Sequence, residues 1–193
     1  MALFRLSRAF EPAPLVRGEG LYLRPPVGDD YDAWSTLRAA SRDFLQPWEP
    51  TWPADDLTRG AFRRRVRRNS DDMARDEAIA LLIFAEADGA LLGGLTIGQI
   101  RRGVAQAATL GYWMGERHAG KGHMTRAVAA ACRYAFETLR LHRMEAACLP
   151  ENAASAALLA ANGFGREGLA RSYLQIDGRW RDHLTFAKLE GDR

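Results

Sequence analysis

The chain has 193 residues, of which 47% are hydrophobic and 26% are charged, and its formal net charge is +3. This length supports one well-buried core rather than two domains, and the mixture of 27 basic and 24 acidic residues excludes a disordered or fibrous chain. The small positive excess does not by itself identify an anionic partner.

The N-terminal residues predict an extended arm over residues 1–17. Pro12 and Pro14 cannot donate backbone hydrogen bonds, and glycines follow at positions 18 and 20. Charged residues and prolines interrupt the apolar positions of the arm, so it forms no signal-peptide core. No run in the chain approaches the roughly 18 apolar residues of a membrane span. We therefore expect one domain over residues 18–190, a cytoplasmic location and no membrane partner.

The first half of the domain shows strand, helix and loop patterns in turn. Residues 21–24 predict a short strand stopped by prolines, and a helical pattern follows from Tyr31 to Arg38. Residues 45–53 contain three prolines and two tryptophans, which indicate a rigid aromatic loop of the kind that often forms a binding surface. From Asp55 to the polar segment 69–72, a second helix or helix pair is expected.

The second half predicts most of a sheet. Asp88-Gly89 separates apolar runs at 79–85 and 90–100, which is the strongest hairpin pattern in the chain. Apolar residues recur every three or four positions from Met124 to Leu139 and predict a long helix packed on a sheet. The other expected elements are strands at 109–114, 143–149, 164–176 and 183–189 and a short helix at 152–162.

This order of elements predicts a mixed α/β (α+β) fold. The strand, long helix and strand over residues 109–149 imply a parallel βαβ unit, because parallel neighbours need a crossover connection. The hairpins imply antiparallel strands on the flanks of the same sheet.

A glycine loop joins the strand at 109–114 to the long helix. Gly120 and Gly122 allow the backbone to approach an anion, and the start of the helix adds unpaired N–H donors and the positive end of its dipole. The loop is not a Walker loop, because Lys121 lacks a following Ser or Thr at the required spacing, and it is not a GxGxxG dinucleotide motif. It predicts a phosphate site.

Four segments resemble N-acetyltransferases of the GNAT superfamily. Arg117-His118-Ala119-Gly120-Lys121-Gly122 is similar to the Arg/Gln-x-x-Gly-x-Gly/Ala loop that holds the coenzyme A (CoA) pyrophosphate. Asn152-Ala153-Ala154-Ser155 and Asn162-Gly163-Phe164 resemble a motif pair of the RimJ/RimL branch, and Trp48-Glu49-Pro50 more weakly resembles the substrate loop of RimJ-type ribosomal-protein-alanine acetyltransferases. The resemblance implies the GNAT fold, a mixed sheet of about six to seven strands, splayed between two parallel strands and flanked by about four helices.

The resemblance also implies acetyl-CoA as cosubstrate, no metal, and a set of cofactor-binding residues. These residues are Tyr112, Trp113, Met114, Arg117, Gly120, Lys121, Gly122, His123, Met124, Asn152 and Ser155. In the family the asparagine helps to hold the pantetheine arm or adjacent backbone, and the serine is the proposed acid for the leaving thiolate. Leu159 stands where many other GNAT enzymes carry a tyrosine, so Ser155 is the better acid candidate. Asn152 also stands where a helix cap belongs.

In the implied reaction a neutral amine attacks the thioester directly, without a covalent enzyme intermediate. The site must accept a proton from nitrogen, stabilise an oxyanion and release a thiolate. A backbone N–H near Met114, in the gap between strands that end near Met114 and Leu149, is the expected oxyanion donor. Leu174 stands where some RimL-type enzymes carry a glutamate. The general base therefore stays open among Glu49, Glu145 and an ordered water chain.

By resemblance, the acceptor is the N-terminal alanine amine of a small-subunit ribosomal protein. A small amine, such as an antibiotic, polyamine or amino acid, is a second acceptor class, and a catalytically weak CoA-binding or RNA-associated module is the alternative of another class. The run from Arg63 to Arg68 is a candidate for weak ribosome contact, although this spacing more often makes a solvated helix face. The four histidines and two cysteines show no metal or disulfide spacing. Monomer and homodimer are both expected states.

Overall fold

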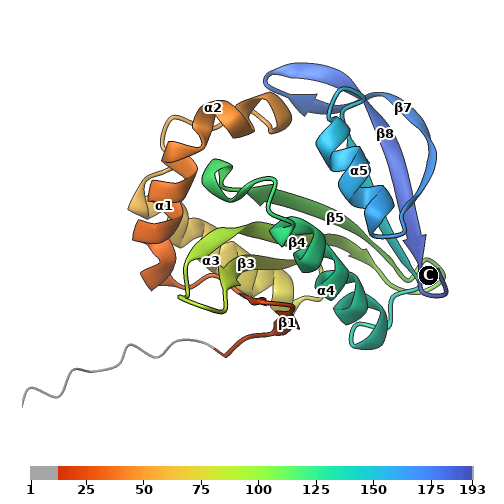
Figure 1. The fold of residues 1–193 in the computed structure, drawn as a ribbon, viewed down its shortest axis with the longest axis horizontal. Helices are drawn as coiled ribbons and strands as arrows, with labels where there is room; N and C mark the ends of the chain where they lie inside the picture. The colour runs from red at the N-terminus through yellow and green to blue at the C-terminus, as the bar shows by residue number, and fades with distance from the viewer. Residues whose placement is uncertain (1–12, 193) are drawn as a thin grey trace, which may run out of the picture.

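An eight-stranded mixed sheet organises the chain (Figure 1). The computed structural model describes residues 13–192. The strands are β1 (Val16–Gly18), β2 (Leu21–Arg24), β3 (Ile79–Ala85), β4 (Leu91–Arg101), β5 (Ala107–Met114), β6 (Arg143–Cys148), β7 (Gly165–Ile176) and β8 (Arg179–Leu189). Their order in the sheet is β1-β2-β3-β4-β5-β6-β8-β7. Among the strands of residues 13–192, only β5 and β6 are parallel, while every other pair of neighbours is antiparallel.

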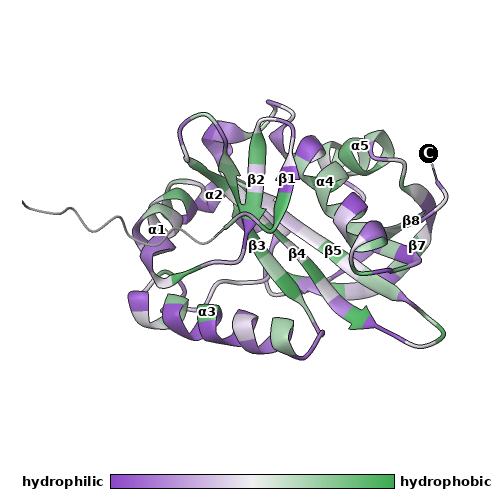
Figure 2. Cartoon of the chain, turned by 90° about the horizontal axis from the view of Figure 1, so that it is seen from below, coloured by the Kyte–Doolittle hydropathy of each residue, from purple (hydrophilic) through white to green (hydrophobic). Residues whose placement is uncertain are grey.

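Helices lie on both faces of this sheet (Figure 2). They are α1 (Tyr31–Ala40), α2 (Arg42–Leu45), α3 (Arg59–Ala74), α4 (His123–Glu137) and α5 (Ala153–Ala161), with short 3-10 turns η1 (Gly28–Asp30), η2 (Gln46–Trp48) and η3 (Glu116–His118). Apolar residues at three- and four-residue spacing let α4 bury one side against the sheet. Residues of α4, such as Ala127 and Val128, share a core with β5, β6 and α5, whereas Trp34 of α1 and Phe62 of α3 form a second core on the other face.

The mixed α/β class and the parallel unit β5–α4–β6 are confirmed by this topology. The hairpin expected at Asp88-Gly89 joins β3 and β4. The sheet has eight strands rather than about six to seven, because Val16 and Arg17, expected in the N-terminal arm, pair with β2. Residues 1–12 of that arm lie outside the described residues. Part of the expected aromatic loop forms η2, and the four-residue α2 precedes it, which raises the number of α-helices to five.

The two parallel strands separate soon after they begin. β5 and β6 pair through Ala107 with Arg143, Ala108 with Met144 and Thr109 with Glu145. Beyond that point, β5 stays paired with β4 and β6 stays paired with β8. The two strands therefore diverge, and we call the opening between residues 110–114 and 146–148 the β5–β6 splay. It leaves backbone groups on the β6 side of β5 without a strand partner.

Side chains alternate between the two faces of the sheet on either side of the splay. Met114 and Cys148 belong to the core beneath α4 and α5, and Tyr112 packs against that core. Trp113 instead packs against the second core, with Trp34 and Phe62. The splay therefore has a helix face, covered by α4 and α5, and an opposite face that carries Trp113.

Candidate active site

The glycine loop forms a group of unpaired amides at the start of α4. Gly120 and Gly122 adopt φ values of 71° and 73°, in the left-handed region that glycine tolerates best. Gly122 is the N-cap of α4, and the first bond into the helix runs from the Arg126 amide to the Gly122 carbonyl at 3.2 Å. Within residues 13–192, the amides of residues 120–125 donate to no backbone or side-chain acceptor. This segment can therefore donate to an anion.

Positive side chains surround these amides. Arg117 Nε donates to His118 Nε2 at 3.0 Å, Arg126 Nη2 lies 2.9 Å from His123 Nδ1, and Lys121 Nζ donates to the Arg117 carbonyl at 2.8 Å. Burial first, and then the neighbouring positive charges, lower the pKa of both His118 and His123. Within the described part of the chain, no carboxylate forms an ion pair with these arginines or with Lys121. A bound anion would supply the missing negative charge.

A hydrogen bond joins the two sides of the splay on its helix face. The hydroxyls of Tyr112 and Ser155 lie 2.8 Å apart, and the Asn152 side chain caps α5 by accepting from the Ser155 amide at 3.0 Å. Burial raises the pKa of Tyr112 to about 12, against the opposing effect of the Ser155 hydrogen bond. Burial also raises the pKa of the Cys148 thiol, and a hydrogen bond with Ser155 opposes this shift too. Ser155 thus lies between side chains of β5 and β6.

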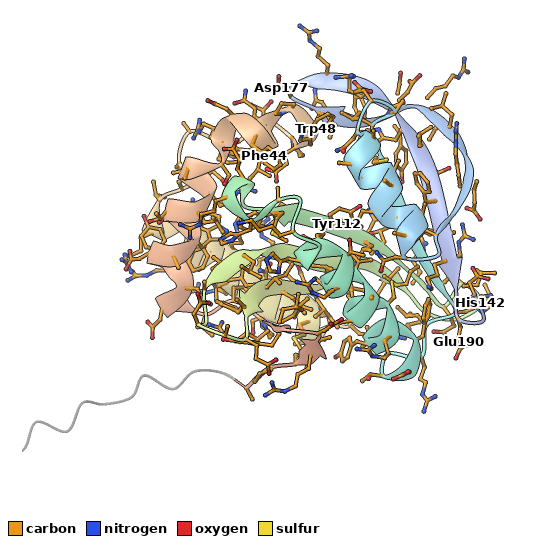
Figure 3. All side chains as sticks on the ribbon, viewed as in Figure 1. Phe44, Trp48, Tyr112, His142, Asp177 and Glu190 are labelled. Atoms are coloured by element: carbon orange, nitrogen blue, oxygen red, sulfur yellow. The ribbon has the colours of Figure 1, made fainter. Side chains whose placement is uncertain are left out.

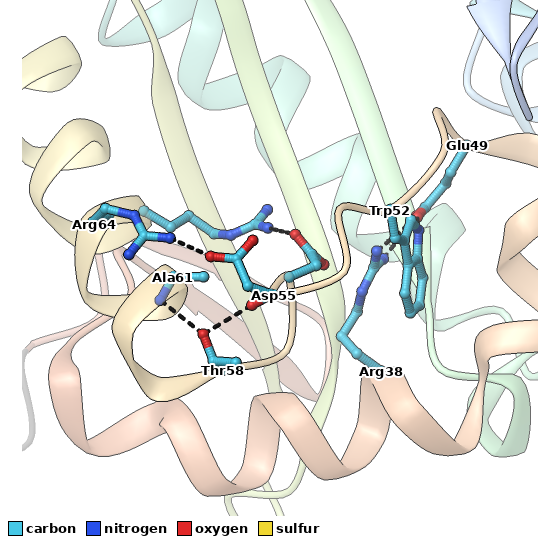
Figure 4. A network of polar contacts seen from close by, with 9 residues as sticks. Arg38, Glu49, Trp52, Asp55, Thr58, Ala61 and Arg64 are labelled. Carbon is cyan, nitrogen blue, oxygen red and sulfur yellow. Dashed lines mark hydrogen bonds and ion pairs between the residues drawn. The ribbon is translucent and has the colours of Figure 1, made fainter.

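The carboxylate of Glu49 is enclosed by three donors (Figure 4). Arg38 donates to its two oxygens at 2.7 and 2.6 Å, and Trp52 Nε1 donates at 2.7 Å. The guanidinium carbon of Arg38 lies 4.0 Å from the ring centroid of Trp52 and 4.9 Å from that of Trp113. The side chains of Arg38 and Glu49 are only 7% and 20% exposed. This ion pair fixes the aromatic loop to α1.

The same loop also contacts the turn between β7 and β8. The Asp177 amide donates to the Glu49 carbonyl at 3.0 Å, and Gln46 Nε2 donates to Asp177 Oδ1 at 3.3 Å. Figure 3 shows Trp48 and Asp177 near each other at the upper edge of the molecule, above Tyr112. The aromatic loop therefore bridges α1 and the β7–β8 hairpin.

Glu145 lies where β5 and β6 are still paired, opposite Thr109. Its carboxylate accepts from Arg101 at 2.5 Å and from Arg143 at 2.9 Å. Burial alone would raise the pKa of Glu145, but the hydrogen bonds from Arg101 and Arg143 lower it overall. The structure thus places Glu145 in an ion-pair cluster away from Ser155 and the open end of the splay.

The structure brings together one part of the residue set expected from the sequence. Tyr112, Asn152 and Ser155 meet on the helix face of the splay, and Arg117 to Met124 surround the start of α4. The side chain of Trp113 instead lies on the opposite face, next to Arg38. Sequence reasoning missed the Tyr112–Ser155 contact, which joins residues 43 positions apart. It also missed Arg38, although the apolar helical pattern around that arginine suggested its burial.

The arginine run lies on α3, on the face of the sheet opposite α4 (Figure 2). Arg64 pairs with Asp55 at 2.5 Å and Arg65 pairs with Asp56 at 2.6 Å. Arg63, Arg67 and Arg68 are exposed, and they form no ion pair or hydrogen bond within residues 13–192. These three arginines are therefore available to an anionic surface.

The described residues contain neither a membrane-spanning helix nor a metal-binding cluster. None of the helices within residues 13–192 is both long and apolar enough to cross a membrane. Across the same residues, no cluster of three or more His, Cys, Asp or Glu side chains could hold a metal ion.

Comparisons with known proteins agree with this geometry. The family model "Acetyltransferase (GNAT) domain" matches residues 20–165. Probable N-acetyltransferase YjcK of Bacillus subtilis (strain 168) is 35% identical over 178 residues, which span 92% of this chain and 98% of that protein. Ribosomal protein uS5-alanine N-acetyltransferase of Escherichia coli (strain K12) is 36% identical over 160 residues, 82% of each chain. The structure of Mycobacterium smegmatis RimJ in complex with CoA-disulfide is 35% identical, with a TM-score of 0.84 over 92% of this chain and 86% of that one.

Proposed function

The chain belongs to the GNAT family of acetyltransferases, and we propose that it transfers acetyl from acetyl-CoA to the N-terminal alanine amine of a ribosomal protein. The observation that carries this proposal is the coincidence of two features at the ends of β5 and β6. Unpaired amides at 120–125 suit a diphosphate, and Ser155 lies beside the splay on the same helix face. A solved relative, RimJ of Mycobacterium smegmatis, was determined with CoA-disulfide.

The residues around the start of α4 fit the CoA diphosphate. Gly120 and Gly122 hold the loop in a conformation that exposes consecutive amides, while Arg117 and Lys121 add positive charge. Because burial and the neighbouring cations lower the pKa of His118 and His123, negative phosphates would oppose this shift and raise the pKa of both imidazoles. The loop therefore holds the coenzyme, and the splay receives its thioester end.

The splay supplies the groups that act on the thioester. Beyond Thr109, amides of β5 on the β6 side lack a strand partner, so an amide near Met114 can donate to the developing oxyanion. On the helix face, the Ser155 hydroxyl donates to the departing sulfur. Tyr112 is a positioning residue. Its hydroxyl lies 2.8 Å from Ser155 Oγ, and when the phenol donates to that oxygen, the serine proton is free for the sulfur.

The pKa of Tyr112 limits what this hydroxyl pair can do. With that pKa raised to about 12 and an ordinary thiol pKa of about 8.5, complete proton transfer from Tyr112 to the thiolate is uphill by about 5 kcal/mol. Ser155 and Tyr112 therefore stabilise the thiolate by hydrogen bonding, and the thiol proton comes ultimately from the amine through solvent.

The acceptor class rests on the relatives and on the aromatic loop. The E. coli relative is named for an alanine amine of a ribosomal protein, and it covers 82% of this chain. The loop containing Trp48 and Glu49 bridges α1 and the β7–β8 turn, where it can hold an extended peptide against aromatic side chains. Arg63, Arg67 and Arg68 on α3 would add contact with ribosomal RNA.

A panel of acceptors tests this proposal. Peptides that begin with alanine should be acetylated at the α-amine, and blocking that amine should abolish transfer. Polyamines, aminoglycosides and free amino acids, assayed at the same concentration, should react at least about tenfold more slowly, because they lack the peptide contacts. A preference for any of these small amines would overturn the peptide assignment.

With ribosomal particles, replacing Arg63, Arg67 and Arg68 by glutamine should reduce the salt dependence of binding.

A further inference from the structure

The amine needs a proton acceptor, and the nearby carboxylates are already engaged. Glu49 accepts from Arg38 and Trp52, and Glu145 accepts from Arg101 and Arg143. Glu151, which follows β6, is paired with Arg181. A carboxylate whose oxygens already accept from a guanidinium is poorly placed to accept a proton from the amine as well. Another titratable group near the splay is therefore better placed to act as the base.

His183 lies beside the end of β6, on the face opposite α4 and α5. Cys148, the last residue of β6, pairs with Leu184 of β8, and both pack in the core beneath those helices. Side chains alternate along a strand, so His183 points to the other face. Trp113 also lies on that other face, across the splay. His183 and Ser155 thus lie on opposite faces of the sheet, both near the end of β6.

The surroundings of His183 leave one ring nitrogen available. The side chain is buried, at 3% exposure. Its Nδ1 lies 3.0 Å from the Arg181 carbonyl, and because a carbonyl only accepts, Nδ1 carries the proton and Nε2 carries the lone pair. Nε2 has no hydrogen-bond partner within residues 13–192. This is the tautomer that a proton acceptor requires.

The charged and titratable neighbours of His183 are few and mostly paired. From β7, the ring of Tyr173 meets the imidazole edge-on at a centroid distance of 5.8 Å. On β8 itself, the Arg181 guanidinium pairs with Glu151, and Asp182 accepts from the Ser172 amide at 2.8 Å. Leu174, which pairs with Arg181, brings no titratable group. The carboxylates of Glu151 and Asp182 therefore already accept from other groups.

We propose that His183 is the general base that takes the proton from the attacking amine, an inference that rests on the proposed function. The amine nitrogen forms a bond to the thioester carbonyl carbon, and Nε2 accepts one N–H proton. The carbon–sulfur bond then breaks, and the thiolate leaves toward Ser155 on the helix face. The imidazolium returns its proton to solvent, so one thiol proton appears for each amine proton lost. Base and leaving-group donor thus act from the two faces of the splay.

Replacing His183 by glutamine tests this role, with His142→Gln as the matched control, since His142 is exposed just before β6. For His183→Gln we expect kcat for an alanine-starting peptide to fall by about 100-fold or more. The decline of wild-type kcat/KM toward acid pH should also disappear, while calorimetric CoA affinity stays unchanged. His142→Gln should retain the wild-type rate and pH profile. The proposal would be overturned if kcat of His183→Gln fell by less than about threefold. It would also be overturned if kcat/KM of this variant still declined toward acid pH, a part of the profile that we call the acid limb.

A second measurement needs no substitution at His183, in case the buried imidazole is required for folding. In the wild-type protein, the His183 imidazole can be titrated by NMR beside those of His118, His123 and His142, with the His142 signal identified by its loss from His142→Gln. The midpoint for His183 should coincide with that of the fall in wild-type kcat/KM toward acid pH, and a mismatch would rule His183 out. If the wild-type protein acetylates no primary amine, the proposed function itself fails. A loss of activity in His183→Gln alone, with an active wild-type protein, is therefore distinguishable from a failure of the proposed function.

Discussion

At the scale of single residues, Ser155 and Tyr112 depend on each other. Ser155 is held by Asn152 through its amide and by Tyr112 through its hydroxyl. The sequence pattern Asn-x-x-Ser pointed to the cap and to the acid candidate. It did not show that a strand residue 43 positions earlier orients the serine. Such a contact exists only after α5 has packed against the sheet, so local spacing carries no information about it.

Ser155→Ala should lower kcat by about 10- to 100-fold, and Tyr112→Phe by about tenfold, with little change in KM for acetyl-CoA. Both losses should shrink when the acetyl donor has a more acidic thiol, because such a thiolate needs less stabilisation. The double variant should be no slower than Ser155→Ala, since the two hydroxyls act as one unit. Tyr134→Phe, a half-buried tyrosine on α4, is the control. Additive losses, or losses independent of the leaving group, would contradict this pairing.

Glu49 has a structural role that its position in an aromatic loop did not reveal. Glu49→Gln leaves the buried guanidinium of Arg38 without its counter-charge, which should lower the free energy of unfolding by about 3 kcal/mol. For a chain of this size, Tm should fall by about 6–12 °C. Glu86→Gln, which removes an exposed partner of Arg17, should change Tm little. An unchanged Tm together with a lost acid limb of kcat/KM would instead identify Glu49 as the base.

At the scale of elements, the patterned segments were predictable and the irregular ones were not. The apolar spacing of α4 and the Asp88-Gly89 turn specify their structures locally, and both appear where expected. By contrast, η2 forms inside the proline-rich segment at 45–53, because its contacts with Asp177 and Arg38 fix the chain there. β1 likewise needs β2 as a partner, so the pattern of residues 16–18 alone did not predict a strand.

The start of α4 gives the sharpest prediction for an element. At Gly122, φ is 73° and an added Cβ would lie 3.2 Å from Arg126 Nη1, so alanine is strained by about 1–2 kcal/mol. Gly122→Ala should therefore weaken CoA binding about tenfold, as the amides turn away from the diphosphate. Gly89→Ala carries the same kind of strain at φ 69°, with nothing within 4 Å of its added Cβ. If both variants bind CoA as the wild type does, the loop is not the diphosphate site.

At the scale of the whole molecule, one opening between two parallel strands brings together residues that are scattered along the chain. The class of fold and the loop at 117–124 could be predicted, because each is encoded in a contiguous pattern. The division of the splay into two faces could not, because it depends on strand register. That register puts Tyr112 beside Ser155 and sends Trp113 to the opposite side, next to Arg38.

The central claim is that the loop at the start of α4 and the splay together bind acetyl-CoA. Isothermal titration calorimetry of the protein with CoA tests it most directly, beside a parallel titration with pantetheine, which lacks the diphosphate. We predict saturable one-to-one binding of CoA that strengthens as pH falls, because the pKa of His118 and His123 rises when the diphosphate binds. Pantetheine should bind far more weakly. Absence of CoA binding, or equal affinity for pantetheine, would contradict the account.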